Sequence, residues 1–445
     1  MFGTSGVRGP IGAEITADLT LSLGRALASE GADLVVVGRD ARTSGEMLEH
    51  AFIAGAAECG ADVIRIGTNS TPTIARSAEW LGADAAAAIT ASHNPPTDNG
   101  VKLWTSSGRA FGRDRRERIE RRVREEEYEF AAWDGIGSIR ERDTYERHRE
   151  ELRTSVDIDA PLSVVVGVGN GTGRLTADAL ADLGCEVSTL NGQRDGRFPS
   201  RPSEPTAEAI RPLRTHVEAV GADLGIAHDG DADRMVAVDG DGRVVAGDTL
   251  LSVFAREAAT DGDRIAVPVN TSLAVDDAVA EVGADVVRTR VGDTFVAERC
   301  AEPGVVFGGE PSGAWIWSGE TPCPDGPLAA CKLVELVSRR GPLADLADEI
   351  DGYPLRRGSV STDHKRRVLD RVEAPLRAEY EGIDDRDGLR VETDNGWFLV
   401  RASGTQPLVR VTAEARTDAE ADGLFEEAMA MVEERADPAP APDRT

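Results

Sequence analysis

The tripeptide Gly-Ala-Asp constrains the fold of this chain more than any other feature of its sequence. It begins at positions 31, 60, 82, 221 and 283, each time between a helix-like segment and a short apolar run. The clearest runs are Leu34–Val37, Val63–Ile66, Leu224–Ala227 and Val286–Val287. A glycine that ends a helix in the left-handed conformation, followed by a buried strand, is typical of alternating α and β units. We therefore expect α/β domains with mostly parallel or mixed sheets.

The chain is long enough for several domains. Its 445 residues exceed what one ordinary core accommodates. The charged stretch from Arg113 to Arg153 predicts one or two solvated helices at the end of the first domain, and the strand-like Ser163–Val166 opens the second. The predicted domains span residues 1–153, 154–246, 247–358 and 359–436, and a Pro- and Ala-rich tail at 437–445 is predicted to be disordered.

The charge balance is strongly acidic. With 50 basic and 79 acidic side chains, the formal net charge is −29. Nucleic acid and anionic membranes would be repelled over the whole surface, so we expect neither as a partner. Lysine occurs only at positions 102, 332 and 365. We interpret this composition as halophilic, an adaptation to a salt-filled cytoplasm, because the Debye length at molar salt is only about 3 Å.

The cysteines favour a reducing compartment. Five are scattered along the chain without a Cys-x-x-Cys pair, which is typical of thiols in a cytosol rather than of a disulfide framework. The chain shows no pattern of a zinc site. It also lacks a signal-peptide pattern and any apolar stretch near the roughly 20 residues that span a bilayer. We expect a soluble, cytoplasmic protein.

The segment Thr90-Ala91-Ser92-His93-Asn94-Pro95-Pro96 is the first candidate site. It follows the small-residue run at 84–89, so a proline-stiffened loop would hold the Ser92 hydroxyl at the carboxyl edge of a sheet. Enzymes of the α/β class place ligands at that edge. An ordinary turn without function is the alternative. No Gly-x-Ser-x-Gly elbow surrounds Ser92, which argues against an esterase.

The segment Asp229-Gly230-Asp231-Ala232-Asp233-Arg234 is the second candidate. Carboxylates at three alternate positions of one short loop repel one another unless a hard divalent cation gathers them. An EF-hand is excluded, because Arg234 and Gly240 occupy the positions that require glycine and glutamate. A solvated acidic turn is the alternative. Three carboxylates leave room for a phosphate oxygen on Mg²⁺.

The segment Arg401-Ala402-Ser403-Gly404-Thr405-Gln406-Pro407, with Arg410, is the third candidate. Backbone amides of a Ser-Gly-Thr turn and two flanking guanidinium groups can cradle an anion, and arginine grips phosphate bidentately. A surface ion pair is the alternative.

Together these segments resemble the α-D-phosphohexomutase family over nearly the whole chain. Matching stretches include Phe2-Gly3-Thr4-Ser5-Gly6-Val7-Arg8-Gly9, Asp195-Gly196-Arg197-Phe198-Pro199, Arg201, Glu204-Pro205, Val291-Gly292-Asp293 and Gly309-Glu310-Pro311-Ser312-Gly313. The resemblance implies an α/β fold with the four-domain phosphohexomutase architecture. Three related α/β domains and a smaller C-terminal α+β domain would surround a central cleft.

The resemblance also implies a role for each matched residue. Ser92 would carry the transferable phosphate, and Lys102 and Arg8 would assist proton transfer. His93 and Arg234 would be further catalytic residues beside them. The metal ligands would be Asp229, Asp231, Asp233 and an oxygen on phosphorylated Ser92. The substrate-binding residues would be Gly292, Asp293, Glu310, Ser312, Arg401, Ser403, Gly404, Thr405 and Arg410.

The implied reaction is a phosphoryl shuttle on a hexose phosphate, an isomerase reaction that interconverts the 6-phosphate and the 1-phosphate. It would need one Mg²⁺ per subunit and a hexose bisphosphate as primer, in a monomer or homodimer. The first residues and Gly-Gly-Glu-Pro-Ser-Gly-Ala-Trp at 308–315 are most similar to archaeal phosphoglucosamine mutases; phosphomannomutase and phosphoglucomutase activities are alternatives. Ala314, Thr294 and Gln406 depart from residues that are common in the family.

Two alternative functions belong to other classes, and Lys102 has an alternative interpretation of its own. A non-catalytic sugar-phosphate sensor is disfavoured by the intact Ser92, the three aspartates and Lys102. Lys102 could also be a chance survivor on a surface strand. A dinucleotide site near Gly167–Gly173 is disfavoured, because Thr172 occupies the third glycine position.

Overall fold

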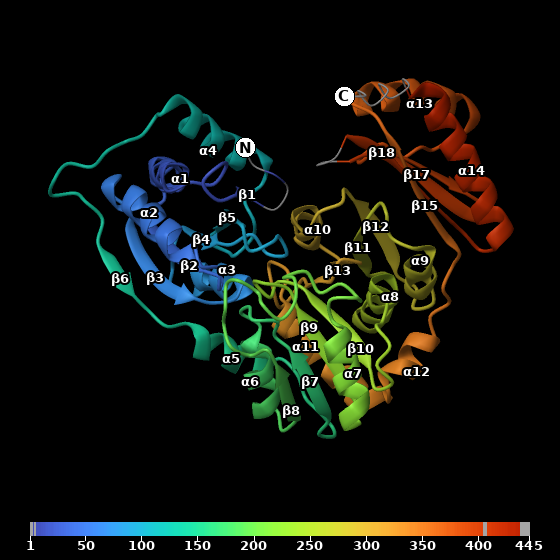
Figure 1. The fold of residues 1–445 in the computed structure, drawn as a ribbon, viewed down its shortest axis with the longest axis horizontal. Coiled ribbons are helices and arrows are strands. Elements are labelled where there is room, and N and C mark those ends of the chain that lie inside the picture. The colour runs from blue at the N-terminus through green and yellow to red at the C-terminus, as the bar shows by residue number, and fades with distance from the viewer. Residues whose placement is uncertain (1–2, 4–5, 404–406, 437–445) are drawn as a thin grey trace, which may run out of the picture.

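A computed structural model describes residues 3, 6–403 and 407–436 of the chain. These residues form four sheets that follow one another along the sequence, each with its own helices, and we call the four groups units I to IV (Figure 1). The units form an arc, so that units I and IV lie on opposite sides of the upper part of Figure 1. The predictions for Gly404, Thr405 and the tail at 437–445 lie outside the described residues.

Unit I has a six-stranded sheet in the order β1-β5-β4-β2-β3-β6. Its strands are β1 (Val7–Pro10), β2 (Leu34–Arg39), β3 (Asp62–Thr68), β4 (Ala85–Ile89), β5 (Asp98–Thr105) and β6 (Ile139–Glu141). Its main helices are α1 (Ala17–Ser29), α2 (Gly45–Glu58) and α3 (Thr71–Trp80). The sheet is mixed, because β5 runs antiparallel to both of its neighbours. Helices cover both faces: Val35 and Val37 of β2 belong to the core cluster of α1 and α2, and Val36 belongs to that of α3.

Units II and III each contain a four-stranded sheet with three parallel strands and one antiparallel edge strand. The strands of unit II are β7 (Ser163–Gly167), β8 (Glu186–Leu190), β9 (Leu224–His228) and β10 (Met235–Asp239), in the order β10-β9-β7-β8. Those of unit III are β11 (Arg264–Pro268), β12 (Asp285–Thr289), β13 (Val305–Glu310) and β14 (Ala314–Trp317), in the order β12-β11-β13-β14. The helices are α6 (Arg174–Asp182), α7 (Arg211–Val220), α8 (Gly247–Ala258), α9 (Leu273–Ala280), α10 (Asp293–Cys300), α11 (Gly326–Arg340) and α12 (Leu343–Asp348). One hydrophobic core joins the two units, since Val164 and Leu175 share a cluster with Ile265.

Unit IV is an antiparallel sheet in the order β15-β18-β17-β16. Its elements are β15 (Leu355–Ser361), α13 (Lys365–Glu379), β16 (Leu389–Thr393), β17 (Gly396–Ala402), β18 (Leu408–Ala415) and α14 (Asp418–Arg435). Both helices contribute to the core cluster around Phe398, whereas Trp397 and Leu399 pack against Val269 of unit III. The predicted fold class, three α/β domains and a smaller α+β domain, is confirmed.

Each Gly-Ala-Asp tripeptide lies between a helix and a strand, as predicted. The helices before them are α1, α2, α3, α7 and α9, and the strands that begin at or directly after the aspartate are β2, β3, β4, β9 and β12. The five glycines have φ angles between +65° and +95°. A side chain is strained in this left-handed conformation, so glycine is the residue that ends these helices without cost.

The charged stretch from Arg113 to Arg153 contains α4 (Arg113–Glu125), which precedes β6 of unit I, and most of α5 (Tyr145–Thr154), which confirms the two predicted helices. Within the described ranges, no helix has the length and apolar character needed to cross a membrane. The residue numbers given above for the domain boundaries remain predictions.

Candidate active site

Ser92 lies in the loop that joins β4 to β5, at the carboxyl edge of the sheet of unit I. It is 1% exposed and has a φ of +51°, a left-handed conformation that costs free energy for a residue with a side chain. Its backbone N–H donates to Thr90 Oγ1 at 2.9 Å. Its hydroxyl donates to Asp229 Oδ2 at 2.6 Å, although 137 positions separate the two residues. The structure thus brings the first two candidate segments together.

The three aspartates lie in the loop between β9 and β10, at the carboxyl edge of the sheet of unit II. All three are buried, and one carboxylate oxygen from each lies within 4.8 Å of the others. Asp231 Oδ1 and Asp233 Oδ1 have no hydrogen-bond partner among the described residues. Buried oxygens normally have a partner. Three converging carboxylates with two unpartnered oxygens fit a hard divalent cation such as Mg²⁺.

The electrostatics of the three aspartates show why they need positive charge. Burial and the carboxylates of Asp233 and Asp231 raise the pKa of Asp229 well above its ordinary value. Burial and Asp231 also raise the pKa of Asp233. Burial acts in the same direction on Asp231, but Lys102 and a hydrogen bond from Thr71 outweigh it and lower the pKa. A bound cation would relieve the repulsion that remains.

Lys102 supplies part of that charge. It lies on β5, and its Nζ is 3.0 Å from Asp231 Oδ2 and 2.5 Å from Asp233 Oδ2. Although burial lowers the pKa of Lys102, these two carboxylates raise it above the ordinary value. Lys102 is 5% exposed, so the alternative that it is a chance survivor on a surface strand is wrong.

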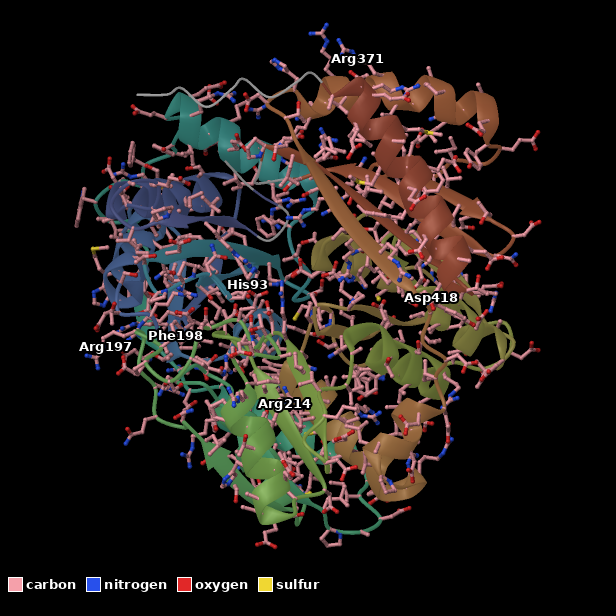
Figure 2. All side chains as sticks on the ribbon, turned by 45° about the vertical axis from the view of Figure 1, so that its right-hand side comes forward. His93, Arg197, Phe198, Arg214, Arg371 and Asp418 are labelled. Atoms are coloured by element: carbon pink, nitrogen blue, oxygen red, sulfur yellow. The ribbon has the colours of Figure 1, made fainter. Side chains whose placement is uncertain are left out.

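Three further predicted catalytic residues, Arg8, His93 and Arg234, line the cleft beside Ser92 and the aspartates. Arg8 lies on β1, and its Nε is buried without a hydrogen-bond partner among the described residues. His93 lies near the centre of the molecule (Figure 2), with Nδ1 3.4 Å from Ser92 Oγ. Burial and the charges of Arg234 and Arg8 lower the pKa of His93 to about 3, so its ring is neutral at pH 7.

Four of the predicted substrate-binding residues come from unit III. Glu310 ends β13, and its carboxylate accepts hydrogen bonds from the Gly292 N–H at 2.7 Å and from Ser312 Oγ at 3.2 Å. Burial and the negative charge of Asp293 raise the pKa of Glu310 to about 7. Asp293 begins α10, and Gly292 before it has a φ of +138°. The structure thus places the four residues side by side.

The predicted phosphate clamp lies on unit IV. Arg401 and Arg410 are opposite each other on β17 and β18, so their side chains are on the same face of the sheet. Arg401 forms an ion pair with Asp387 at 2.9 Å, and the same carboxylate oxygen accepts the Val291 N–H at 3.0 Å. Ser403 is buried at the end of the described part of this segment.

One cleft contains residues from all four units. Its volume is about 900 Å³, which is ample for a phosphorylated hexose. Its basic lining residues are Arg8, Arg234, Arg290, Arg386 and Arg401, and its acidic ones are Asp293, Glu310 and Asp387. In a protein with a net charge of −29, this local excess of arginine favours an anionic ligand.

The departures from the family pattern lie in different places. Ala314 is buried at the start of β14, and its backbone pairs with that of Arg234. Thr294 is buried in α10. Gln406 is outside the described residues.

The sequence motifs gave no role to the polar side chains that support the two loops. Thr71 Oγ1 donates to Asp231 Oδ2 at 2.5 Å, and Thr90 Oγ1 lies 3.1 Å from the same atom. Asp40 and Arg42, which directly follow β2, contact the loop of Ser92. Their place after a strand is the one signal that points to them, because the carboxyl ends of parallel strands meet at one edge of a sheet.

Comparisons with known sequences match the same family along nearly the whole chain. Four domain models of the phosphoglucomutase/phosphomannomutase family match: α/β/α domain I at residues 1–130, domain II at 143–242, domain III at 246–353 and the C-terminal domain at 359–431. A protein from Methanothermobacter thermautotrophicus named probable phosphoglucosamine mutase is 43% identical over 442 residues, covering 97% of this chain and 98% of that protein. One of the same name from Methanococcoides burtonii is 44% identical over 438 residues, covering 98% of this chain and 99% of that protein.

Solved structures give the same result. A phosphoglucomutase/phosphomannomutase family protein from Burkholderia thailandensis superposes with a TM-score of 0.89 at 28% identity, covering 98% of this chain and 99% of that chain. A structure described as a phosphomannomutase of Thermus thermophilus gives a TM-score of 0.80 at 25% identity, covering 97% and 99%. The chain carries all four domains of that architecture in order, and it belongs to the phosphoglucomutase/phosphomannomutase family of phosphohexomutases.

Proposed function

We propose that this protein is a magnesium-dependent phosphoglucosamine mutase, an isomerase that interconverts the 6-phosphate and the 1-phosphate of glucosamine. One observation carries the proposal: Ser92 Oγ lies 2.6 Å from a carboxylate of a buried aspartate cluster, two of whose oxygens have no partner within the described part of the chain. A phosphate on that hydroxyl would share the cation with the three aspartates. The names of the archaeal relatives support glucosamine phosphate as the substrate.

Ser92 carries the phosphoryl group in this reaction. The P–O bond to Ser92 breaks and a P–O bond to a sugar hydroxyl forms, which gives a bisphosphorylated hexose. The sugar then turns over, and its other phosphoryl group returns to Ser92. When bound, Mg²⁺ neutralises charge on the transferred phosphoryl group and on the serine oxygen.

The surrounding side chains move protons and hold the sugar. Lys102, which Asp231 and Asp233 keep protonated, donates a proton to the serine oxygen as the phosphoryl group leaves. The proton that the attacking sugar hydroxyl releases restores Lys102, and Arg8 assists both transfers. Arg234 stabilises negative charge, and the neutral His93 ring offers a hydrogen bond beside Ser92. Glu310 and Ser312 bind sugar hydroxyls together with Gly292 and Asp293. The phosphate that does not react is held by Arg401, Ser403, Gly404, Thr405 and Arg410.

The finer assignments belong to the same proposal. A hexose bisphosphate primes Ser92, one Mg²⁺ is bound per subunit, and the enzyme is a monomer or homodimer of a salt-rich cytoplasm. The cysteines support that compartment, since all five, which lie within the described ranges, are free thiols. The net charge of −29 supports the salt-rich setting.

Initial rates on three substrates test the proposal. The enzyme is incubated with Mg²⁺, a hexose bisphosphate primer and, separately, glucosamine 6-phosphate, mannose 6-phosphate or glucose 6-phosphate. We expect the fastest conversion with glucosamine 6-phosphate and none with the Ser92→Ala variant. A lower rate on glucosamine 6-phosphate than on the other two would overturn the substrate, and an active Ser92→Ala variant would overturn the mechanism.

A further inference from the structure

One buried guanidinium group holds the loop that carries Ser92. Arg42, in the turn between β2 and α2, is 1% exposed. Its Nη2 donates to the carbonyl oxygens of Ser92 and Asn94, both at 2.7 Å. Its Nη1 donates to the carbonyl oxygens of Pro95 at 2.6 Å and Asp98 at 2.8 Å. Four carbonyl groups, three from the Ser92 loop and one from the start of β5, thus converge on a single side chain.

Asp40 orients this guanidinium group and ties it to the serine. Its Oδ2 accepts a hydrogen bond from Arg42 Nε at 3.0 Å, and its Oδ1 accepts the Arg42 N–H at 2.9 Å. The same Oδ2 lies 2.8 Å from Thr90 Oγ1, and Thr90 Oγ1 accepts the Ser92 N–H. The N–H and the carbonyl group of Ser92 are therefore fixed by one connected set of side chains.

A turn of unit II that contains Phe198 packs against Arg42. The ring centroid of Phe198 is 5.2 Å from Arg42 Cζ, and Phe198 is buried, with a φ of +48°. A cation over an aromatic face is favourable when both are desolvated. Arg197, its neighbour in the chain, is instead 77% exposed at the surface (Figure 2).

Gly196 lets this turn approach the segment of Arg42. A Cβ atom at position 196 would lie 2.3 Å from the carbonyl oxygen of Ala41 and 2.4 Å from the backbone nitrogen of Thr43. Backbone atoms cannot move aside for it, so a side chain there would push the two units apart. The Asp195–Pro199 motif, which the proposed function leaves without a role, thus packs on the support of the Ser92 loop.

We infer that Arg42, held by Asp40 and covered by Phe198, is the positioning residue that sets Ser92 for phosphoryl transfer. This inference rests on the proposed function. Ser92 has a left-handed backbone that is unfavourable by itself, so the loop needs external support. A planar guanidinium group offers five N–H donors in a fixed fork, whereas lysine offers three on a flexible stem and cannot serve four carbonyl oxygens and Asp40 at once.

Kinetic measurements distinguish a positioning role of Arg42 from a role in stability alone. A displaced Ser92 Oγ slows the transfer step without touching the residues that bind the sugar, and misplacement by about 1 Å can cost about 100-fold in rate. We therefore expect Arg42→Lys to lower kcat about 100-fold while KM changes by less than about threefold. Transfer of phosphate from the hexose bisphosphate to Ser92, followed by intact mass, should slow by the same factor.

Phe52→Leu is the matched control. Phe52 is fully buried in α2 of the same unit, in the core cluster that includes Leu23 and Leu27 of α1. Its side chain donates no hydrogen bond to the Ser92 loop, so we expect its truncation to lower stability without releasing Ser92. The thermal midpoints of both variants are measured in the same KCl buffer. We expect both variants to lose a similar amount of stability. Phe52→Leu should nevertheless keep kcat within about twofold of the parent.

Two results would overturn the inference: an Arg42→Lys enzyme with kcat within threefold of the parent, or equal losses of kcat in both variants. If Arg42→Lys does not fold, Phe198→Leu replaces it. We expect this variant to lose about tenfold in kcat, because the aromatic ring over Arg42 is missing. A kcat within twofold of the parent would be the contrary result. The Ser92→Ala enzyme is assayed in parallel. Its activity decides the proposed function independently of Arg42.

Discussion

The buried carboxylate of Glu310 lowers the free energy of unfolding when it is ionised, and the structure gives the size of this effect. Its pKa rises from an ordinary 4.5 to about 7 because burial and then Asp293 disfavour the carboxylate. The folded protein therefore holds the proton more tightly than the unfolded chain does. It loses stability as the pH rises from about 4.5 to about 7, and one pKa unit is worth about 1.4 kcal/mol. The ionised carboxylate thus costs the folded state about 3 kcal/mol above pH 7.

Glu310→Gln removes this cost while keeping the shape of the side chain. Its amide oxygen can still accept the Gly292 N–H. We expect the variant to match the parent below about pH 4.5 and to exceed its free energy of unfolding by up to about 3 kcal/mol above pH 7. Urea titrations between pH 4.5 and 8, without metal and at one KCl concentration, measure the difference. The same variant should bind hexose phosphate more weakly, because a proposed ligand of the sugar is lost.

Glu302→Gln is the control for the loss of one negative charge. Glu302 pairs with Arg299 in a partly exposed position just before β13. Its substitution should shift the free energy of unfolding by about the same small amount at every pH. If the Glu310→Gln curve runs parallel to that of the parent over the whole range, the buried charge of Glu310 carries no cost and the reasoning fails.

Three further results are expected. Lys102→Gln should lower kcat by about 10²-fold or more with little change in KM, because a positioned proton donor is worth that much; steady-state kinetics with an unchanged kcat would contradict its role. Arg401→Ala should raise KM for the hexose phosphate about tenfold or more through the loss of a charge-assisted phosphate contact, and an unchanged KM would remove Arg401 from the clamp. The thermal midpoint should rise steadily between dilute and molar KCl, because salt screens the 79 acidic side chains; a midpoint independent of KCl would refute the halophilic interpretation.

Local sequence signals predicted the fold well, because they act over a few residues. Each Gly-Ala-Asp reports a helix end and a strand start, and both are set by the φ of one glycine and the apolar run after it. The order of strands within each sheet was not predicted. It depends on pairings between distant segments, such as β5 between β1 and β4.

The sequence predicted those parts of the candidate site that belong to a short motif of charged or polar residues. The three aspartates and Ser92 lie together as expected from the order of the motifs. The Lys102 ion pairs join residues about 130 positions apart, and no spacing within the sequence encodes such a contact. Arg42 was missed for the same reason, since all of its acceptors in the Ser92 loop are 50 or more positions away.

Transfer of a labelled phosphoryl group tests the central claim most directly. The enzyme is labelled on Ser92 with radioactive phosphate, freed of excess primer, and mixed with Mg²⁺ and glucosamine 6-phosphate for less than one turnover. The account predicts that the label leaves Ser92 and appears in a bisphosphorylated sugar at a rate no slower than kcat, and that Ser92→Ala takes up no label. Label that stays on the protein while the sugar phosphate is isomerised would contradict it.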